Sequence, residues 1–113
     1  MKVIKSDDNI LEFDNGLVVS GVGDQDCCAI NYLDFEQLPV GTEVPTMTIS
    51  EFVDAITIKD DGFIIKDSQG TPKWVQARSD QNGYYSNMTT LNVKQKGKKV
   101  KLGELSGTIG EDY

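Results

Sequence analysis

Short runs of strand-forming residues alternate along this chain with turn residues, and this alternation limits the fold more than any other feature. Residues 10–13 and 17–22 flank Asp14-Asn15-Gly16. An Asn-Gly pair supplies the positive φ angles that a tight β-hairpin turn needs. The pattern therefore predicts a hairpin near the start of the chain and a mainly antiparallel β protein.

The middle of the chain repeats this pattern. Residues 55–59 and 63–67 flank Asp60-Asp61-Gly62, which predicts a second hairpin. Further strands are expected at 73–78 and, after another turn, at 84–93. These four runs follow one another with short turns between them, so we expect them to form an antiparallel meander.

Less regular sequence lies between the first hairpin and the meander. Residues 28–33 favour a strand, with Cys28, Ile30 and Tyr32 on one face. Asp34 is a suitable cap for a short helical turn over 35–38, and Ser50 is a suitable cap for a second helix over 50–55. The predicted fold class is mainly β, as a single antiparallel sheet or a small sandwich with one or two short helices, and an α+β protein remains open.

The length of 113 residues fits a single domain over residues 1–113. A chain of this size buries roughly two-thirds of its unfolded surface, which is enough for a core without disulfide or metal staples. Residues 103–113 contain three glycines counting Gly103 and end in Glu-Asp-Tyr. We expect this stretch to be a frayed tail.

Charge is unevenly distributed. The chain has a formal net charge of -7, and its first 67 residues carry 4 lysines against 14 acidic residues. Lysines 94, 96, 98, 99 and 101 follow with no acidic residue between them. An acidic protein binds nucleic acid poorly because both carry negative charge. The lysine stretch also has no aromatic residue to stack on bases, so a nucleic-acid partner is not expected. The lysines are typical of an edge strand that deters unwanted pairing.

Histidine is absent. The 113 residues therefore cannot form a Ser-His or Cys-His nucleophile pair, and we lean against an enzyme. No apolar run approaches the roughly 20 residues of a membrane helix, and the first residues do not resemble a signal peptide. We expect a cytoplasmic protein without a cofactor, in which the two cysteines stay reduced.

The segment Asp24-Gln25-Asp26-Cys27-Cys28 places two thiols beside two carboxylates. A zinc or iron site would use Asp24, Asp26, Cys27 and Cys28, although structural zinc sites usually separate their cysteines by roughly two to four residues. Neighbouring strand residues also point to opposite faces, which hinders a shared ion. A vicinal disulfide acting as a redox switch is the second alternative. We favour a structural role, with one cysteine buried and the other near the surface.

A second candidate segment contains Asn82, Tyr84 and Tyr85, which surround Gly83. Tyrosine offers a large contact area at low entropic cost and is enriched at protein interfaces. On a strand, Tyr84 and Tyr85 would face opposite sides, so at most one of them would belong to the core. The other would cover the sheet or bind a partner.

Taken together, the two segments resemble an uncharacterised family of small phage and bacterial proteins. Its members typically read Asp-Gln-Asp-Cys-Cys-Glu after a first hairpin and Ser-Asn-Gly-Tyr-Tyr-Ser near the C-terminus, a resemblance that covers roughly residues 10 to 93. This chain departs from the family at Ala29, where glutamate is usual, and at Asp80-Gln81, where the family is shorter. The resemblance implies a small, mostly β protein of mobile-element type and carries no mechanism with it.

These observations favour a small non-enzymatic interaction module whose partner is another protein. The predicted contact surface joins Asp24, Asp26, Cys27 and Cys28 to Asn82, Tyr84 and Tyr85, provided that the fold brings the two segments to the same end. A metal-binding or thiol-redox protein centred on Cys27 and Cys28 is the alternative.

Overall fold

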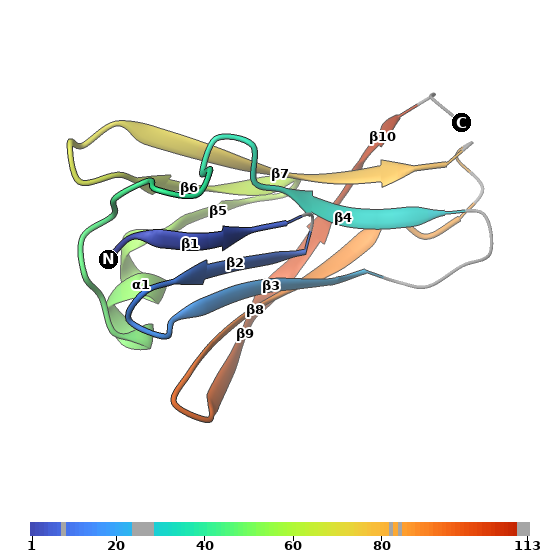
Figure 1. The fold of residues 1–113 in the computed structure, drawn as a ribbon. Helices are drawn as coiled ribbons and strands as arrows, with labels where there is room; N and C mark the ends of the chain where they lie inside the picture. The colour runs from blue at the N-terminus through green and yellow to red at the C-terminus, as the bar shows by residue number, and fades with distance from the viewer. Residues whose placement is uncertain (8, 24–28, 82, 84, 111–113) are drawn as a thin grey trace.

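The computed structural model describes residues 1–7, 9–23, 29–81, 83 and 85–110. Within them the protein is mainly β, as predicted, with strands in two five-stranded sheets and one short helix (Figure 1). In chain order the elements are β1 Val3–Ser6, β2 Ile10–Phe13, β3 Val18–Gly23, β4 Ile30–Asp34, α1 Ile49–Ala55, β5 Thr57–Lys59, β6 Gly62–Lys66, β7 Pro72–Asp80, β8 Met88–Gln95, β9 Lys98–Ser106 and β10 Thr108–Gly110.

The first sheet has the strand order β1-β2-β3-β8-β9, and every neighbouring pair in it is antiparallel. The predicted first hairpin is confirmed as β2 and β3, joined through Asp14-Asn15-Gly16. Strand β1, which was not predicted, pairs with β2 at the edge. The segment after β4 covers that edge: the amide of Val3 donates to the carbonyl of Thr42, and Gly41 donates to the carbonyl of Val3.

The second sheet has the order β10-β7-β6-β5, and β4, which lies off this path, also pairs with β7. The predicted second hairpin is confirmed as β5 and β6, in which Lys59 pairs with Gly62. Strand β10 runs parallel to β7, whereas the other pairs are antiparallel. Strand β7 is thus the centre of this sheet, flanked by β6 along one half and by β4 and β10 along the other.

The meander prediction is correct for β5, β6 and β7 but wrong for the last strand. Strand β8 begins at Met88 instead of residue 84, and it pairs with β3 and β9 in the other sheet. The connection between β7 and β8 is therefore a crossing between sheets and not a hairpin turn. The chain can cross here because the connection between β7 and β8 contains residues, such as Tyr85, that belong to no strand.

One of the two helix predictions needs correction. The helix near residue 50 exists as α1, but its cap is Thr48: the hydroxyl of Thr48 accepts from the amide of Glu51, and the carboxylate of Glu51 accepts from the amide of Thr48. This reciprocal pair is a capping box, which extends the helix by one residue at its start. Residues 35–38 form the short turn that was predicted: Leu38 donates to the carbonyl of Phe35, and the amide of Glu36 donates to Oδ1 of Asp34.

The expected frayed tail is ordered over most of its length. Residues 103–106 belong to β9, and 108–110 form β10. The side chain of Leu105 is fully buried. The last three residues lie outside the described part of the chain.

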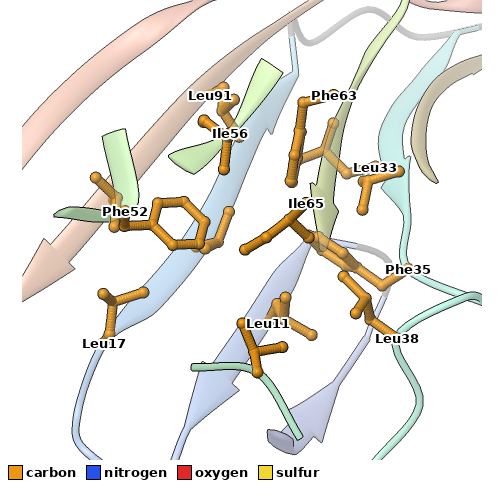
Figure 2. Close-up of a cluster of buried hydrophobic side chains, with 14 of the residues drawn as sticks. Leu11, Leu17, Leu33, Phe35, Leu38, Phe52, Ile56, Phe63, Ile65 and Leu91 are labelled. Carbon is orange, nitrogen blue, oxygen red and sulfur yellow. The ribbon is translucent and has the colours of Figure 1, made fainter. Parts of the chain in front are cut away.

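A single hydrophobic core lies between the two sheets (Figure 2). Phe13 comes from the first sheet, Phe63 from the second and Phe52 from α1, and all three side chains are buried. The helix lies at one end of the molecule, whereas the end of β7 and the start of β4 lie at the other (Figure 1). No helix in the described residues is both long and apolar enough to cross a bilayer.

Candidate functional site

The inner faces of the strands change from apolar to polar at the end of the sandwich far from α1. Along β7 the buried residues Val75 and Ala77 are followed by Ser79, and Gln81 follows just beyond the strand. On β8 the order is reversed, because this strand starts at that end, and Thr89 precedes Leu91. Four of the buried polar residues gather here, namely Asn31, Ser79, Gln81 and Thr89. We call this group the polar end.

Two glycines of β3 allow β4 to lie close to the first sheet at the polar end. A Cβ added to Gly21 would lie 2.8 Å from two side-chain carbons of Leu33. A Cβ on Gly23 would lie 2.5 Å from the carbonyl oxygen of Asn31 and 2.6 Å from its Cβ. All of these distances are shorter than real Cβ contacts. Glycine is therefore required at these positions for close approach of the two strands.

Gln81 organises the connection between β7 and β8. Its Nε2 donates to the hydroxyl of Ser79 at 2.6 Å and to the carbonyl of Ser86 at 3.0 Å, while its Oε1 accepts from the amide of Tyr85 at 2.8 Å. The Gln81 side chain is fully buried. A buried side-chain amide must find partners for its donors and its acceptor within the protein. The contacts with Ser79, Ser86 and Tyr85 supply these partners.

The polar end is also tied to β4 and to the last strands. The Nδ2 of Asn31 donates to the same Ser86 carbonyl at 3.0 Å. Asn87 Nδ2 donates to the carbonyl of Gly107 at 2.9 Å, and the amide of Gly107 donates back to the carbonyl of Asn87 at 2.7 Å. The connection from 81 to 87 is thus fixed to three separate parts of the sandwich.

The strand register places the flanks of both candidate segments side by side. Gly23, at the end of β3, pairs with Thr89, and Ile30, at the start of β4, pairs with Asp80. The first segment joins β3 to β4, and the second joins β7 to β8. Their flanks therefore lie at the same end of the sandwich (Figure 1).

Of the site residues predicted from the sequence, Tyr85 lies in the described part of the chain, where it is half-buried. The remaining ones lie outside the described residues, namely Asp24, Asp26, Cys27, Cys28, Asn82 and Tyr84. Exposed apolar side chains flank the first segment. Val22 is 56% exposed and Ile30 is 65% exposed.

The outer surface of β7 next to this end carries an ion pair. Arg78 Nε lies 2.7 Å from Asp34 Oδ2, and this hydrogen bond raises the pKa of Arg78. The guanidinium was already cationic at neutral pH, so the pair fixes its position without altering its charge. The pair fastens β4 to β7 diagonally, since Arg78 is opposite Tyr32 and Asp34 is opposite Gln76.

The described residues of the polar end offer hydrogen-bonding groups. No group of three or more Asp, Glu, Cys or His side chains within these residues is placed to hold a metal ion. The polar end consists of amides and hydroxyls, which hydrogen-bond but lack an acid or base that titrates near neutral pH.

The residues that build the polar end were missed from the sequence as site residues. Asn31, Ser79 and Thr89 each occupy an inward position of a strand, where an apolar residue is expected. These breaks in the alternation of apolar and polar residues could have been recognised from the sequence. Gln81 carried no such signal, since it lies beyond the end of its strand.

Searches against family models, curated proteins and solved structures found no match to this chain. The resemblance to small phage and bacterial proteins stays a prediction from the two sequence segments.

Proposed function

We propose that the protein is a non-enzymatic interaction module that binds another protein through the polar end and the two segments whose flanks lie there. The type of protein that we propose is an accessory protein of a phage or another mobile element, in keeping with the resemblance. The observation that carries the proposal is the register of Gly23 with Thr89 and of Ile30 with Asp80, which brings the flanks of both segments to one end.

Rigidity supports this proposal. The buried amides of Gln81 and Asn31 converge on the Ser86 carbonyl, and Gln81 also holds the amide of Tyr85. A binding surface that is ordered before the partner arrives loses less conformational entropy on association. Tyr85 is thereby held in place next to the flank of the first segment.

Composition supports it as well. Val22 and Ile30 are open to water on the two sides of the first segment. Burying each in an interface would remove apolar surface from water at roughly 25 cal/mol per Å². Tyrosine is enriched at protein contact surfaces, and the buried centre of such a surface is more apolar than the rest of the protein surface.

Site-specific cross-linking tests the proposal. A photoreactive phenylalanine analogue at position 30 is compared with the same residue at position 4, another exposed isoleucine, which lies on β1. We expect a discrete adduct from position 30 in cells that express the protein, and no such adduct from position 4. Unlabelled protein should compete for the adduct, and a Val22→Ser, Ile30→Ser variant should compete poorly. Equal labelling from both positions, or equal competition by both proteins, would contradict the proposal.

A Cys27→Ser, Cys28→Ser double variant separates this function from a metal or redox role. An interaction module should fold normally and keep its partner after the change. Native and denatured masses of the purified wild-type protein give the complementary result. A bound ion, or a loss of two hydrogens that reductant reverses, would argue for chemistry at the cysteine pair.

A further inference from the structure

The second notable surface lies on the β8–β9 hairpin, which we call the lysine hairpin and define as residues 94–101. Five of the 11 basic residues of the chain lie here, on a protein with a net charge of -7. Lys94 and Lys99 are directly opposite one another in the ladder, and Lys101 lies two residues further along β9. All three side chains are exposed.

Placing lysines opposite each other works against stability, because like charges directly across a β ladder repel. Nearby carboxylates do little to relieve this repulsion. Within the described residues, Lys101 pairs with Glu104 at 3.2 Å, and the four other lysines of the hairpin form no ion pair. The surface therefore has uncompensated positive charge that an anionic partner would neutralise.

The charge is located along an open strand edge. Strand β9 is the last strand of the first sheet, and β8 is the neighbour to which it is hydrogen-bonded. Among the described residues, no backbone bond joins Lys98–Lys101 to any other part of the chain on the free side. The ladder is regular over these four residues and shifts register beyond them, between the pairs Asn92–Lys101 and Leu91–Gly103. The available edge is thus a short, flat stretch.

We propose that the free edge of Lys98–Lys101 accepts an extended acidic peptide segment of a protein partner as an additional strand. Backbone groups on an unpaired edge can hydrogen-bond an incoming strand, and side chains at alternate positions of the peptide then select its sequence. Glutamate or aspartate at every second position would lie beside Lys99 and Lys101, which share one face of β9.

The same lysines explain why the edge would be selective. A neutral strand that paired here would have to partly desolvate several ammonium groups without compensation, and this is how edge lysines prevent aggregation. An acidic strand removes that penalty by pairing the charges. The hairpin therefore excludes most strands and admits acidic ones.

A peptide fits the surface better than a nucleic acid does. Residues 94–101 contain no aromatic side chain on which bases could stack. The free backbone edge has hydrogen-bonding groups that match another polypeptide, whereas phosphates would use the ammonium groups alone.

The probe for the test is a fluorescent short peptide in which glutamate and threonine alternate. Its binding to the full chain is measured by fluorescence anisotropy at low and high salt. Two further probes have the same length and the same alternating pattern. One carries N-methyl groups at alternate backbone amides and keeps every charge, and the other has lysine in place of glutamate. An oligothymidylate serves as the nucleic-acid probe.

We expect the acidic peptide to bind, the N-methylated and lysine peptides to bind at least about tenfold more weakly, and higher salt to reduce affinity. A Lys99→Glu, Lys101→Glu variant should lose about tenfold or more in affinity. The control is Lys59→Glu, Lys66→Glu, which makes the same change in net charge on exposed residues of β5 and β6. It should stay within about twofold of the wild type.

Several results would overturn the proposal. Equal binding of the N-methylated peptide would show that charge alone is recognised and that no strand is added. Tighter binding of oligothymidylate would reverse the choice of partner. Equal losses in both lysine variants would remove the hairpin as the site. Amide chemical shifts give an independent reading, because an added strand should shift Lys98–Lys101 and leave β5 unchanged.

Discussion

The side-chain amide of Gln81 donates a 3.0 Å hydrogen bond to the backbone carbonyl of Ser86, and this contact closes the connection between the two sheets. Asn31, on a strand of the second sheet, donates to the same oxygen at 3.0 Å. One carbonyl thus receives two buried donors from different parts of the chain. The arrangement links the crossing from β7 to β8 with the position of β4.

Replacing Gln81 with alanine should reduce the free energy of unfolding by about 2 to 3 kcal/mol, because the buried groups that it satisfies lose their partner. The amide of Tyr85 and the hydroxyl of Ser79 are among them. Urea denaturation followed by tryptophan fluorescence measures the change. Gln69→Ala is the matched control, since Gln69 is exposed in a turn and should stay within about 0.5 kcal/mol of the wild type. Similar losses in both variants would show that the network adds no stability.

Thr89→Val should stabilise the protein. The hydroxyl oxygen of Thr89 is fully buried, and none of the described groups hydrogen-bonds it. A buried hydroxyl without a partner loses its hydration on folding and gains nothing in exchange, so an isosteric methyl group should raise the unfolding free energy by about 1 to 2 kcal/mol.

The same denaturation experiment checks this change against Thr90→Val, the next residue along β8, which faces the other side of the sheet and is half-buried. That control should change stability by less than about 0.5 kcal/mol. Destabilisation by Thr89→Val would mean that the hydroxyl does have a partner in solution.

Gly23→Ala should destabilise the protein by about 1 to 3 kcal/mol, because the new methyl group would overlap the backbone and the Cβ of Asn31. Strand β4 would have to move away from β3. Thermal unfolding of the variant is compared with that of Ser20→Ala, a change on the outward side of the same strand that needs no such movement. An unchanged melting temperature for Gly23→Ala would show that the two strands are not in close contact.

The parts of the fold that follow from local chemistry were predictable. The turns at Asp14-Asn15-Gly16 and Asp60-Asp61-Gly62 predicted both hairpins, although only Gly16 has the positive φ that was expected (86°), and Gly62 is the first residue of β6. The cap of α1 was missed for a related reason: Ser50 is a good cap residue, but Thr48 has Glu51 three positions later and completes the capping box. Thr48 is the cap because its capping box forms two reciprocal hydrogen bonds with Glu51.

The parts that depend on distant pairing were not predictable. Strand β8 has the alternation of a meander strand, and nothing local distinguishes pairing with β7 from pairing with β3. Residues 108–110 form a strand because they pair in parallel with β7, and no turn residue in the sequence predicts this pairing. The candidate site divides in the same way: its two segments were proposed from their composition, whereas the polar end formed by Asn31 and Gln81 appears only when β4 and β7 pair.

The turn of the lysine hairpin leads to a final prediction. Lys96 has a φ of 52° and Gly97 a φ of 81°, so both central residues of this two-residue turn lie in the left-handed region. Asn-Gly is the preferred pair for such a turn, and lysine adopts the conformation at a cost. Lys96→Asn should therefore raise the free energy of unfolding by about 0.5 to 1 kcal/mol. Lys96→Gln is the control, because it removes the same charge and lacks the preference of asparagine for positive φ. Equal stabilisation by both variants would assign the effect to relief of lysine repulsion and not to the backbone.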